Sequence, residues 1–270
     1  MKKKDVFVSA IKGIITGTSL WINNISIGSM LFSASCYDNV IDGLSNIRKK
    51  NNKELLYVCI PLIIGICIGL LAGFNLINYF LSKYRPQTII LFVGFFIGGI
   101  RVVYKKKKLK ITRKNAFIPL VILTVSMILI TLLKEQELFI KNNFVNSLVI
   151  ALISGISLLI PSFSGFISNI KNGFSSILNT LKLSSFNDFL VLLIFILVFI
   201  IVIVLLAKLI RVLLNKNNNN TYLAICSLVL VNVVLLVLQI KTFNLNFVTM
   251  FTSILAFLWG YIFAKNVERE

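Results

Sequence analysis

The feature that most constrains this sequence is an apolar run long enough to cross a lipid bilayer. Residues 189–207, FLVLLIFILVFIIVIVLLA, contain no charged side chain. As a helix this run would reach about 28 Å, close to the roughly 30 Å hydrocarbon core of a bilayer. Similar stretches recur along the chain, in which 57% of the 270 residues are hydrophobic. The sequence therefore predicts an all-α polytopic membrane protein.

Six apolar stretches are uninterrupted, and two others are interrupted near their middles. The predicted crossings are 55–80, 88–104, 115–133, 186–210, 221–240 and 244–264, and the interrupted segments are 6–46 and 146–182. A helix from Asn146 to Pro161 would span only about 22 Å, which is too short to cross. Asp38 and Asp42 cannot lie deep in the bilayer without partners. We therefore expect each interrupted segment to form a re-entrant hairpin.

Basic residues set the predicted orientation. The formal net charge is +19, which in a soluble protein would suggest a nucleic-acid partner. Here 21 of the 28 Lys and Arg residues fall on one side of the predicted layout, in stretches 1–12, 45–54, 101–114, 208–220 and the C-terminus. The positive-inside rule assigns this side, with both termini, to the cytoplasm. The charge thus predicts a bilayer as partner and no nucleic acid.

Three crossings separate the two hairpins, so the hairpins enter from opposite sides of the membrane. This arrangement is an inverted repeat, with halves 1–133 and 134–270, each a hairpin followed by three crossings. The stretch GTSLWINNISIG at 17–28 matches GISLLIPSFSGF at 155–166 in five residues at a constant offset of 138. The matching pairs are Gly17 with Gly155, Ser19 with Ser157, Leu20 with Leu158, Ile22 with Ile160 and Ser26 with Ser164.

The interruption in the second segment predicts a site for an anion. Pro161 lacks an N–H group and disfavours helical angles in the preceding residue, and Gly165 permits angles that other residues resist. A helix restarting near Ser164 would leave free N–H groups at its positive dipole end. With the nearby hydroxyls these groups would suit a phosphate or a carboxylate. The hydroxyls belong to Ser162, Ser164 and Ser168.

The first hairpin carries polar residues in the equivalent place. These are Asn23, Asn24, Ser26 and Ser29 around Gly28. Ser and Gly at such interruptions can also serve packing alone, by allowing close helix approach. Lys171 is a further candidate ligand. The alternative, given equal weight, is that its side chain only extends to place the amine at the membrane surface. Helix-packing seams are predicted by glycines four residues apart, at Gly65, Gly69 and Gly73 and at Gly94 and Gly98. The corresponding stretches of the second half, 190–207 and 222–238, lack glycine, so the two halves cannot pack identically.

The residue types present argue against an enzymatic function. The chain contains no histidine, which removes the usual nucleophile and acid–base group of a lipid-phosphate phosphatase. No paired carboxylates within the crossings offer a metal alternative. Cys36, Cys59, Cys67 and Cys226 form no CxxC pair and predict neither a disulfide nor a metal site. We expect no enzyme activity, metal or cofactor.

These motifs resemble those of the bacterial polyprenyl-phosphate transporter family, whose members carry two copies of a Pro-Gly-x-Ser-Gly pattern. The second copy here is PSFSG, which keeps Pro161, Ser164 and Gly165 and has Ser162 for the first glycine. The first copy is NNISIGS, with Asn23 and Asn24 in place of Pro-Gly. Ser26 and Gly28 are kept, Ser29 stands for threonine, and Tyr37 and Asp38 fall where the family has Tyr-[Asp/Glu].

The resemblance implies a transporter that returns undecaprenyl phosphate from the outer to the cytoplasmic leaflet of the bacterial plasma membrane. Ser162, Ser164 and the N–H groups around Gly165 would then hold the phosphate, facing Ser26, Ser29 and Asn23 or Asn24. Another small anion on the same scaffold, or a relative without transport activity, are the alternatives. No carboxylate falls at the centre of a predicted crossing, so the sequence does not indicate which ion, if any, is coupled to transport.

Overall fold

The computed structural model describes residues 3–47, 55–113, 115–133, 143–162, 186–240 and 246–269, and their regular structure is helical throughout. Helices α4, α5, α9, α10 and α11 are long and apolar enough to cross a membrane. The prediction of an all-α polytopic membrane protein is thereby confirmed. The helices are α1 (Lys3–Ser19), α2 (Ile27–Ser33), α3 (Tyr37–Ser45), α4 (Ile60–Lys83, after a π-helical turn at Leu55–Cys59), α5 (Arg85–Lys106), α6 (Phe117–Leu133), α7 (Asn143–Leu159), α9 (Phe186–Lys216), α10 (Asn218–Leu238) and α11 (Phe247–Arg269).

Both predicted interruptions occur. In the first segment α1 ends at Ser19, and α2 begins only at Ile27. The second limb of this segment is itself divided into α2 and α3, because Ser35 between them adopts a positive φ of 56°. In the second segment α7 ends at Leu159, two residues before Pro161. The rest of the predicted second hairpin, residues 163–182, lies outside the described residues.

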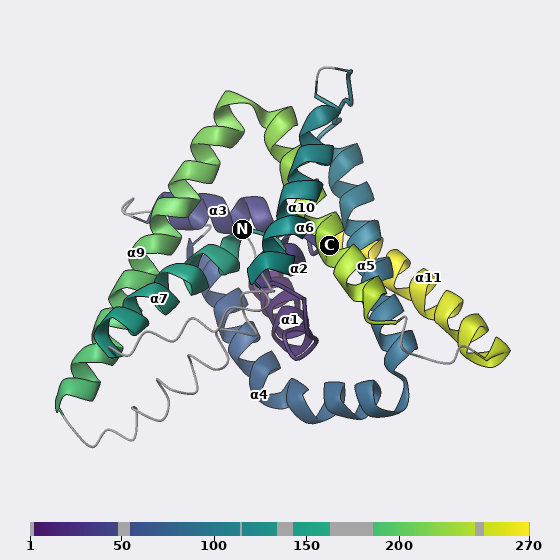
Figure 1. The fold of residues 1–270 in the computed structure, drawn as a ribbon, viewed down its shortest axis with the longest axis horizontal. Helices are drawn as coiled ribbons and strands as arrows, with labels where there is room; N and C mark the ends of the chain where they lie inside the picture. Colours follow the sequence, from purple (N-terminus) through teal and green to yellow (C-terminus); the bar gives the residue numbers. More distant parts are fainter. Residues whose placement is uncertain are drawn as a thin grey trace.

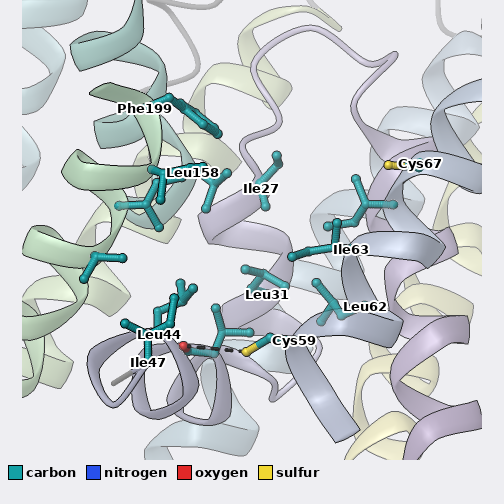
Figure 2. A pocket seen from close by; sticks show the side chains of 15 residues that line it. Ile27, Leu31, Leu44, Ile47, Cys59, Leu62, Ile63, Cys67, Leu158 and Phe199 are labelled. Atoms are coloured by element: carbon teal, nitrogen blue, oxygen red, sulfur yellow. Dashed lines mark hydrogen bonds between the residues drawn. The ribbon is translucent and has the colours of Figure 1, made fainter. Parts of the chain in front are cut away.

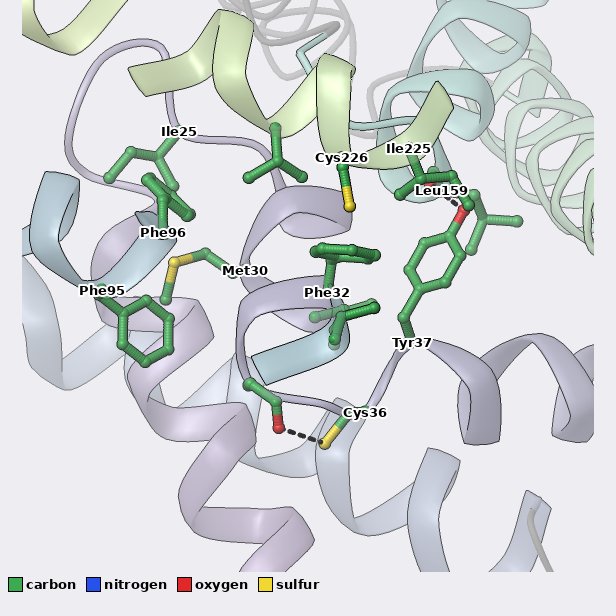
Figure 3. Packing of buried hydrophobic residues seen from close by; sticks show 14 of the residues in the cluster. Ile25, Met30, Phe32, Cys36, Tyr37, Phe95, Phe96, Leu159, Ile225 and Cys226 are labelled. Carbon is green, nitrogen blue, oxygen red and sulfur yellow. Dashed lines mark hydrogen bonds between the residues drawn. The ribbon is translucent and has the colours of Figure 1, made fainter. Parts of the chain in front are cut away.

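The short helix α2 lies at the centre of the molecule (Figure 1). Its residues from Gly28 to Ser33 are all buried, and it contacts α1, α3, α5, α7 and α10. Figure 3 shows Met30 and Phe32 packed among aromatic and aliphatic side chains of α5 and α10. Protein therefore surrounds α2 and its N-cap residue Ser26, which is also buried.

The longer helices pair in the pattern expected of two structurally equivalent halves. Helix α1 packs on α4, and α7 packs on α9; α5 packs on α11, and α10 packs on α6 (Figure 1). With an offset of half the chain, α1, α4, α5 and α6 correspond to α7, α9, α10 and α11. Each contact then has a counterpart in the other half. The inverted repeat and its halves 1–133 and 134–270 stay a prediction, which this pairing supports.

Glycines form the predicted packing seams. A Cβ added at Gly65 or Gly69 of α4 would overlap a backbone carbonyl oxygen of α1, and one added at Gly94 of α5 would overlap the carbonyl of Phe257 in α11. The corresponding contact between α7 and α9 is different, because a Cβ on Gly155 would meet the Val202 side chain at 2.7 Å. The first half thus packs backbone against backbone where the second packs against a side chain.

Segments that the charge pattern assigned to one side of the membrane meet at one end of the molecule. Lys107, directly after α5, pairs with Asp38 of α3 at 2.6 Å. Arg211 of α9 lies 3.5 Å from Asp42 and donates a 2.8 Å hydrogen bond to Ser45. The side chains of Asp38 and Asp42 are 35% and 46% exposed, and each has a basic partner. This end is the predicted cytoplasmic side.

The asparagine-rich stretch 215–222 is helical except at one residue. Only Asn217 lies outside a helix, because α9 continues to Lys216 and α10 begins at Asn218. The Asn219 amide accepts a hydrogen bond from the Lys110 N–H at 2.8 Å and donates one to the Lys110 carbonyl at 2.9 Å. These side chains join the start of α10 to the loop after α5.

The seam between α1 and α4 can be tested with a matched pair of substitutions. Gly69→Val places branched carbon atoms against the α1 backbone and should destabilise the protein by about 1–3 kcal/mol or more. Ala72→Val, an exposed position on the same helix, should have little effect. Thermal unfolding of the purified protein in detergent measures both. Equal unfolding midpoints for the two variants would contradict the seam.

Candidate functional site

The two interruptions touch each other at the centre of the protein. A Cβ added at Gly28, in the first turn of α2, would lie 2.9 Å from the carbonyl oxygen of Leu159 and 3.2 Å from the carbonyl carbon of Ile160. Leu159 and Ile160 are the last residues before the Pro161 turn. The start of α2 therefore packs on the broken end of α7, with no room for a side chain at residue 28.

A hydrogen bond joins the two interrupted segments at this junction. The Tyr37 hydroxyl donates to the Leu159 carbonyl at a distance of 3.0 Å, as Figure 3 shows. The last carbonyls of a helix have no partner within it, and one left unpaired in an apolar interior costs free energy. Tyr37 supplies the missing donor. The tyrosine of the first motif thus stabilises the interruption that contains the second.

Asn24 and Ser162 share an unusual backbone conformation. Their φ angles are 68° and 71°, in the left-handed region that favours glycine. The two residues stand at the same offset of 138 as the matched pairs in the sequence. They are also the residues that replace the first glycine of each family motif. The backbone turn that glycine would favour is therefore kept at both positions, and asparagine tolerates it best among other residues.

Hydroxyl groups at the start of α2 hydrogen-bond to one another. Ser26 is the N-cap, and its oxygen accepts the Ser29 N–H at 3.2 Å. The Ser26 hydroxyl donates to the Ser29 oxygen at 2.9 Å, and the Ser29 hydroxyl donates to the Ser26 carbonyl at 2.8 Å. The Asn232 amide of α10 donates to the Ser26 oxygen at 3.3 Å. All three side chains are fully buried, so this arrangement is closed to water.

The structure brings together part of the predicted set of ligands. Ser26, Gly28 and Ser29 lie at the start of α2, which packs on Leu159 and Ile160, and the next two residues of the chain, Pro161 and Ser162, are buried. Asn24 is half-buried, whereas Asn23 is exposed and its backbone carbonyl accepts a hydrogen bond from Gln239 at 3.1 Å. The other predicted ligands, Ser164, Gly165 and Lys171, lie outside the described residues.

An apolar groove of about 290 Å³ leads away from the junction (Figure 2). Ile27 and Leu158, which flank the two interruptions, form its inner end. Its walls come from α4 and α9, and α3 contributes Leu44 and nearby side chains. Every lining residue is apolar: Ile27, Leu31, Val40, Leu44, Ile47, Cys59, Leu62, Ile63, Ile66, Cys67, Leu158, Phe199, Ile200, Ile203 and Val204. Such a surface suits a hydrocarbon chain.

A polar cluster surrounds Asp38 at the start of α3, on the predicted cytoplasmic side. The Tyr222 hydroxyl of α10 donates a hydrogen bond to the Asp38 carboxylate, which also pairs with Lys107. The Lys107 amine lies 4.8 Å from the centre of the Tyr222 ring. Three elements distant in sequence, α3, α10 and the segment after α5, are thus held together.

Sequence reasoning missed several of these residues. Asn232 could have been noticed, because it is an amide near the middle of a largely apolar predicted crossing, and such residues often bond to a neighbouring helix. Tyr222 and Lys107 carried no comparable signal. Their pairing with Asp38 depends on how the helices pack, which the sequence pattern did not specify.

Substitutions at Asn24 test the left-handed turn. Both Asn24→Gly and Asn24→Val remove the side-chain amide, but only glycine accepts a φ of 68° without strain. We expect the valine variant to be less stable than the glycine variant by about 1–2 kcal/mol or more. Thermal unfolding in detergent is the measurement, and Asn23→Val, one residue earlier, controls for an exposed valine. Equal stability of the two Asn24 variants would rule out the strain.

Comparison with known proteins agrees with the motifs. Residues 1–121 match the family model described as VCA0040-like, undecaprenyl phosphate translocase-like. A protein named polyprenyl-phosphate transporter from Staphylococcus aureus is 25% identical over 132 residues, which cover 48% of this chain and 47% of that protein. The match therefore spans about half the length of this relative. No solved structure matches the chain. The predicted resemblance to the polyprenyl-phosphate transporter family is confirmed over residues 1–121, the part of the chain that contains the first motif.

Proposed function

We propose that this protein moves a polyprenyl phosphate, such as undecaprenyl phosphate, from the outer to the cytoplasmic leaflet of a bacterial plasma membrane. The observation that carries the proposal is the continuity between a polar junction of two interrupted helices and an entirely apolar groove. A lipid phosphate has the matching division into a charged group and a hydrocarbon chain. The direction of transport follows from the family resemblance.

The phosphate binds where α2 meets the end of α7. In the arrangement described above, Ser26 and Ser29 are closed off by Gly28 packing against Leu159. Access therefore requires α2 and α7 to separate, which frees hydroxyl and N–H groups to donate to the phosphate oxygens. The proposed set of ligands is completed by Ser162, two residues after Ile160, and by Ser164, Gly165, Asn23, Asn24 and Lys171.

The polyprenyl chain occupies the groove between α4 and α9. Charged phosphate is costly to move through hydrocarbon, whereas the chain can stay in an apolar environment throughout. The groove begins at Ile27 and Leu158, directly beside the junction, so one molecule can occupy both regions. This feature favours a lipid over a small water-soluble anion, since the latter would gain nothing from an apolar groove.

Serine substitutions test the phosphate site. In proteoliposomes, Ser26→Ala combined with Ser29→Ala should slow the movement of labelled polyprenyl phosphate by about tenfold or more, because hydrogen bonds to charged groups contribute roughly 1.5–3 kcal/mol. Ser126→Ala removes a hydroxyl that bonds only within α6 and should leave the rate unchanged. Equal rates in all three proteins would refute the site.

A pair of adjacent positions on α9 tests the groove. Ile200 lines it, whereas Ile201 does not, and the two are 50% and 48% exposed. Ile200→Trp should fill the groove and slow polyprenyl-phosphate movement severalfold, while Ile201→Trp, which faces away, should have no effect. If both variants transport like the unmodified protein, the chain does not use the groove. Movement of a water-soluble phosphate but not the lipid by the unmodified protein would contradict the proposed substrate.

A further inference from the structure

A second cavity, of about 380 Å³, lies between α5 and α11, away from the junction. Its volume falls within the roughly 300–1,000 Å³ typical of small-molecule sites. Four of its seven lining residues are basic and none is acidic: Gly98, Arg101, Val102, Lys105, Lys106, Tyr261 and Lys265. The proposed path of the transported lipid makes no use of it.

The basic side chains converge from two helices. Arg101 and Lys105 are four residues apart and therefore share one face of α5, and Tyr261 and Lys265 share one face of α11 in the same way. The Arg101 guanidinium lies 5.8 Å from the centre of the Tyr261 ring. Like charges facing each other across a cavity repel, so an anion between them would be stabilised.

Ordinary roles account for the presence of these charges but not for their convergence on one cavity. Arg101, Lys105 and Lys265 belong to stretches whose positive charge sets the predicted orientation, which does not require them to face each other. Lysines in the last turn of a helix interact favourably with its dipole, which explains Lys105 and Lys106 but not Arg101, which lies before that turn. Among the residues that the structure describes, Arg101, Lys105 and Lys265 take part in no ion pair. Three positive charges at one cavity are thus available to a ligand.

The surroundings indicate a lipid rather than a free ion. α5 and α11 are both long and apolar enough to cross a membrane, and Lys105, Lys106 and Lys265 of the cavity lie near their C-terminal ends. In a helix that crosses the bilayer, such positions would be close to the lipid headgroups. Leu258 and Ile262 on α11 are 46% and 52% exposed and lead toward Lys265, offering an apolar surface for acyl chains. Basic pockets between transmembrane helices are known to hold anionic headgroups.

We propose that the cavity between α5 and α11 binds the phosphate headgroup of an anionic glycerophospholipid. Arg101, Lys105 and Lys265 contact the phosphate, and the acyl chains lie along α11. With the predicted orientation this site faces the cytoplasmic leaflet. It is separate from the junction at α2 and α7, so the proposal does not depend on which molecule the protein transports.

The test compares two triple variants of the full-length protein that lose the same charge. Arg101→Gln, Lys105→Gln and Lys265→Gln remove three of the cavity's four positive charges, whereas Lys108→Gln, Lys110→Gln and Arg113→Gln remove three charges from the following loop. Thermal unfolding in neutral detergent is followed against added phosphatidylglycerol, phosphatidylcholine or inorganic phosphate. Phosphatidylglycerol should raise the midpoint of the unmodified protein, and half-saturation should need about tenfold to a hundredfold more lipid in the cavity variant only.

Other results would overturn the proposal. Equal responses of both triple variants to phosphatidylglycerol would show general charge attraction, and an unmodified protein that does not respond would have no such site. An equal effect of phosphatidylcholine would remove the requirement for an anion. If inorganic phosphate acts as strongly as the lipid, the site takes a soluble anion instead. Should the cavity variant fold poorly, Lys105→Glu compared with Lys108→Glu gives the same contrast with one exposed residue each.

Discussion

The structure depends on how a membrane protein satisfies backbone groups where its helices break. In a bilayer each unpaired N–H or C=O costs several kcal/mol, so an interrupted helix is stable only where protein or water covers it. Here α2 is surrounded by five other helices, and the Tyr37 hydroxyl bonds to the Leu159 carbonyl at the end of α7. The two interruptions protect each other, and for that reason they lie in contact rather than apart.

Close contact between the two interruptions requires space for the backbones to approach and a left-handed turn in each interruption. Gly28 allows α2 to reach the α7 backbone, and Asn24 and Ser162 adopt the left-handed turn that each interruption needs. The glycine seams of α1 with α4 and of α5 with α11 hold the surrounding helices equally close. The groove lies between α4 and α9, and the basic cavity lies between α5 and α11. Packing and candidate binding sites are thus two results of the same helix arrangement.

The crossing helices, the end of α7 and the packing seams could be predicted from the sequence, because apolar length, proline and glycine spacing are properties of local segments. Apolar length identified the crossing helices, and Pro161 marked the end of α7. Spacing of glycines predicted both seams. The candidate site was predicted less completely. Gly28 does pack on the residues directly before Pro161, but the closure of Ser26 and Ser29 by hydrogen bonds to each other and to Asn232 was not foreseen. The bond from Asn232 joins it to a residue 206 positions away in the sequence, which no local pattern can specify.

The sequence by itself determined the class of protein, the positions of its interrupted helices and the motifs that relate it to a family. These follow from properties that each segment has alone: apolar length, backbone freedom and charge. Only the tertiary structure decided that the interruptions meet, that Tyr37 bridges them, and that an apolar groove and a basic cavity form beside particular helix pairs. The physical reason is that cavities and cross-helix hydrogen bonds arise from the relative placement of elements, which no single segment encodes.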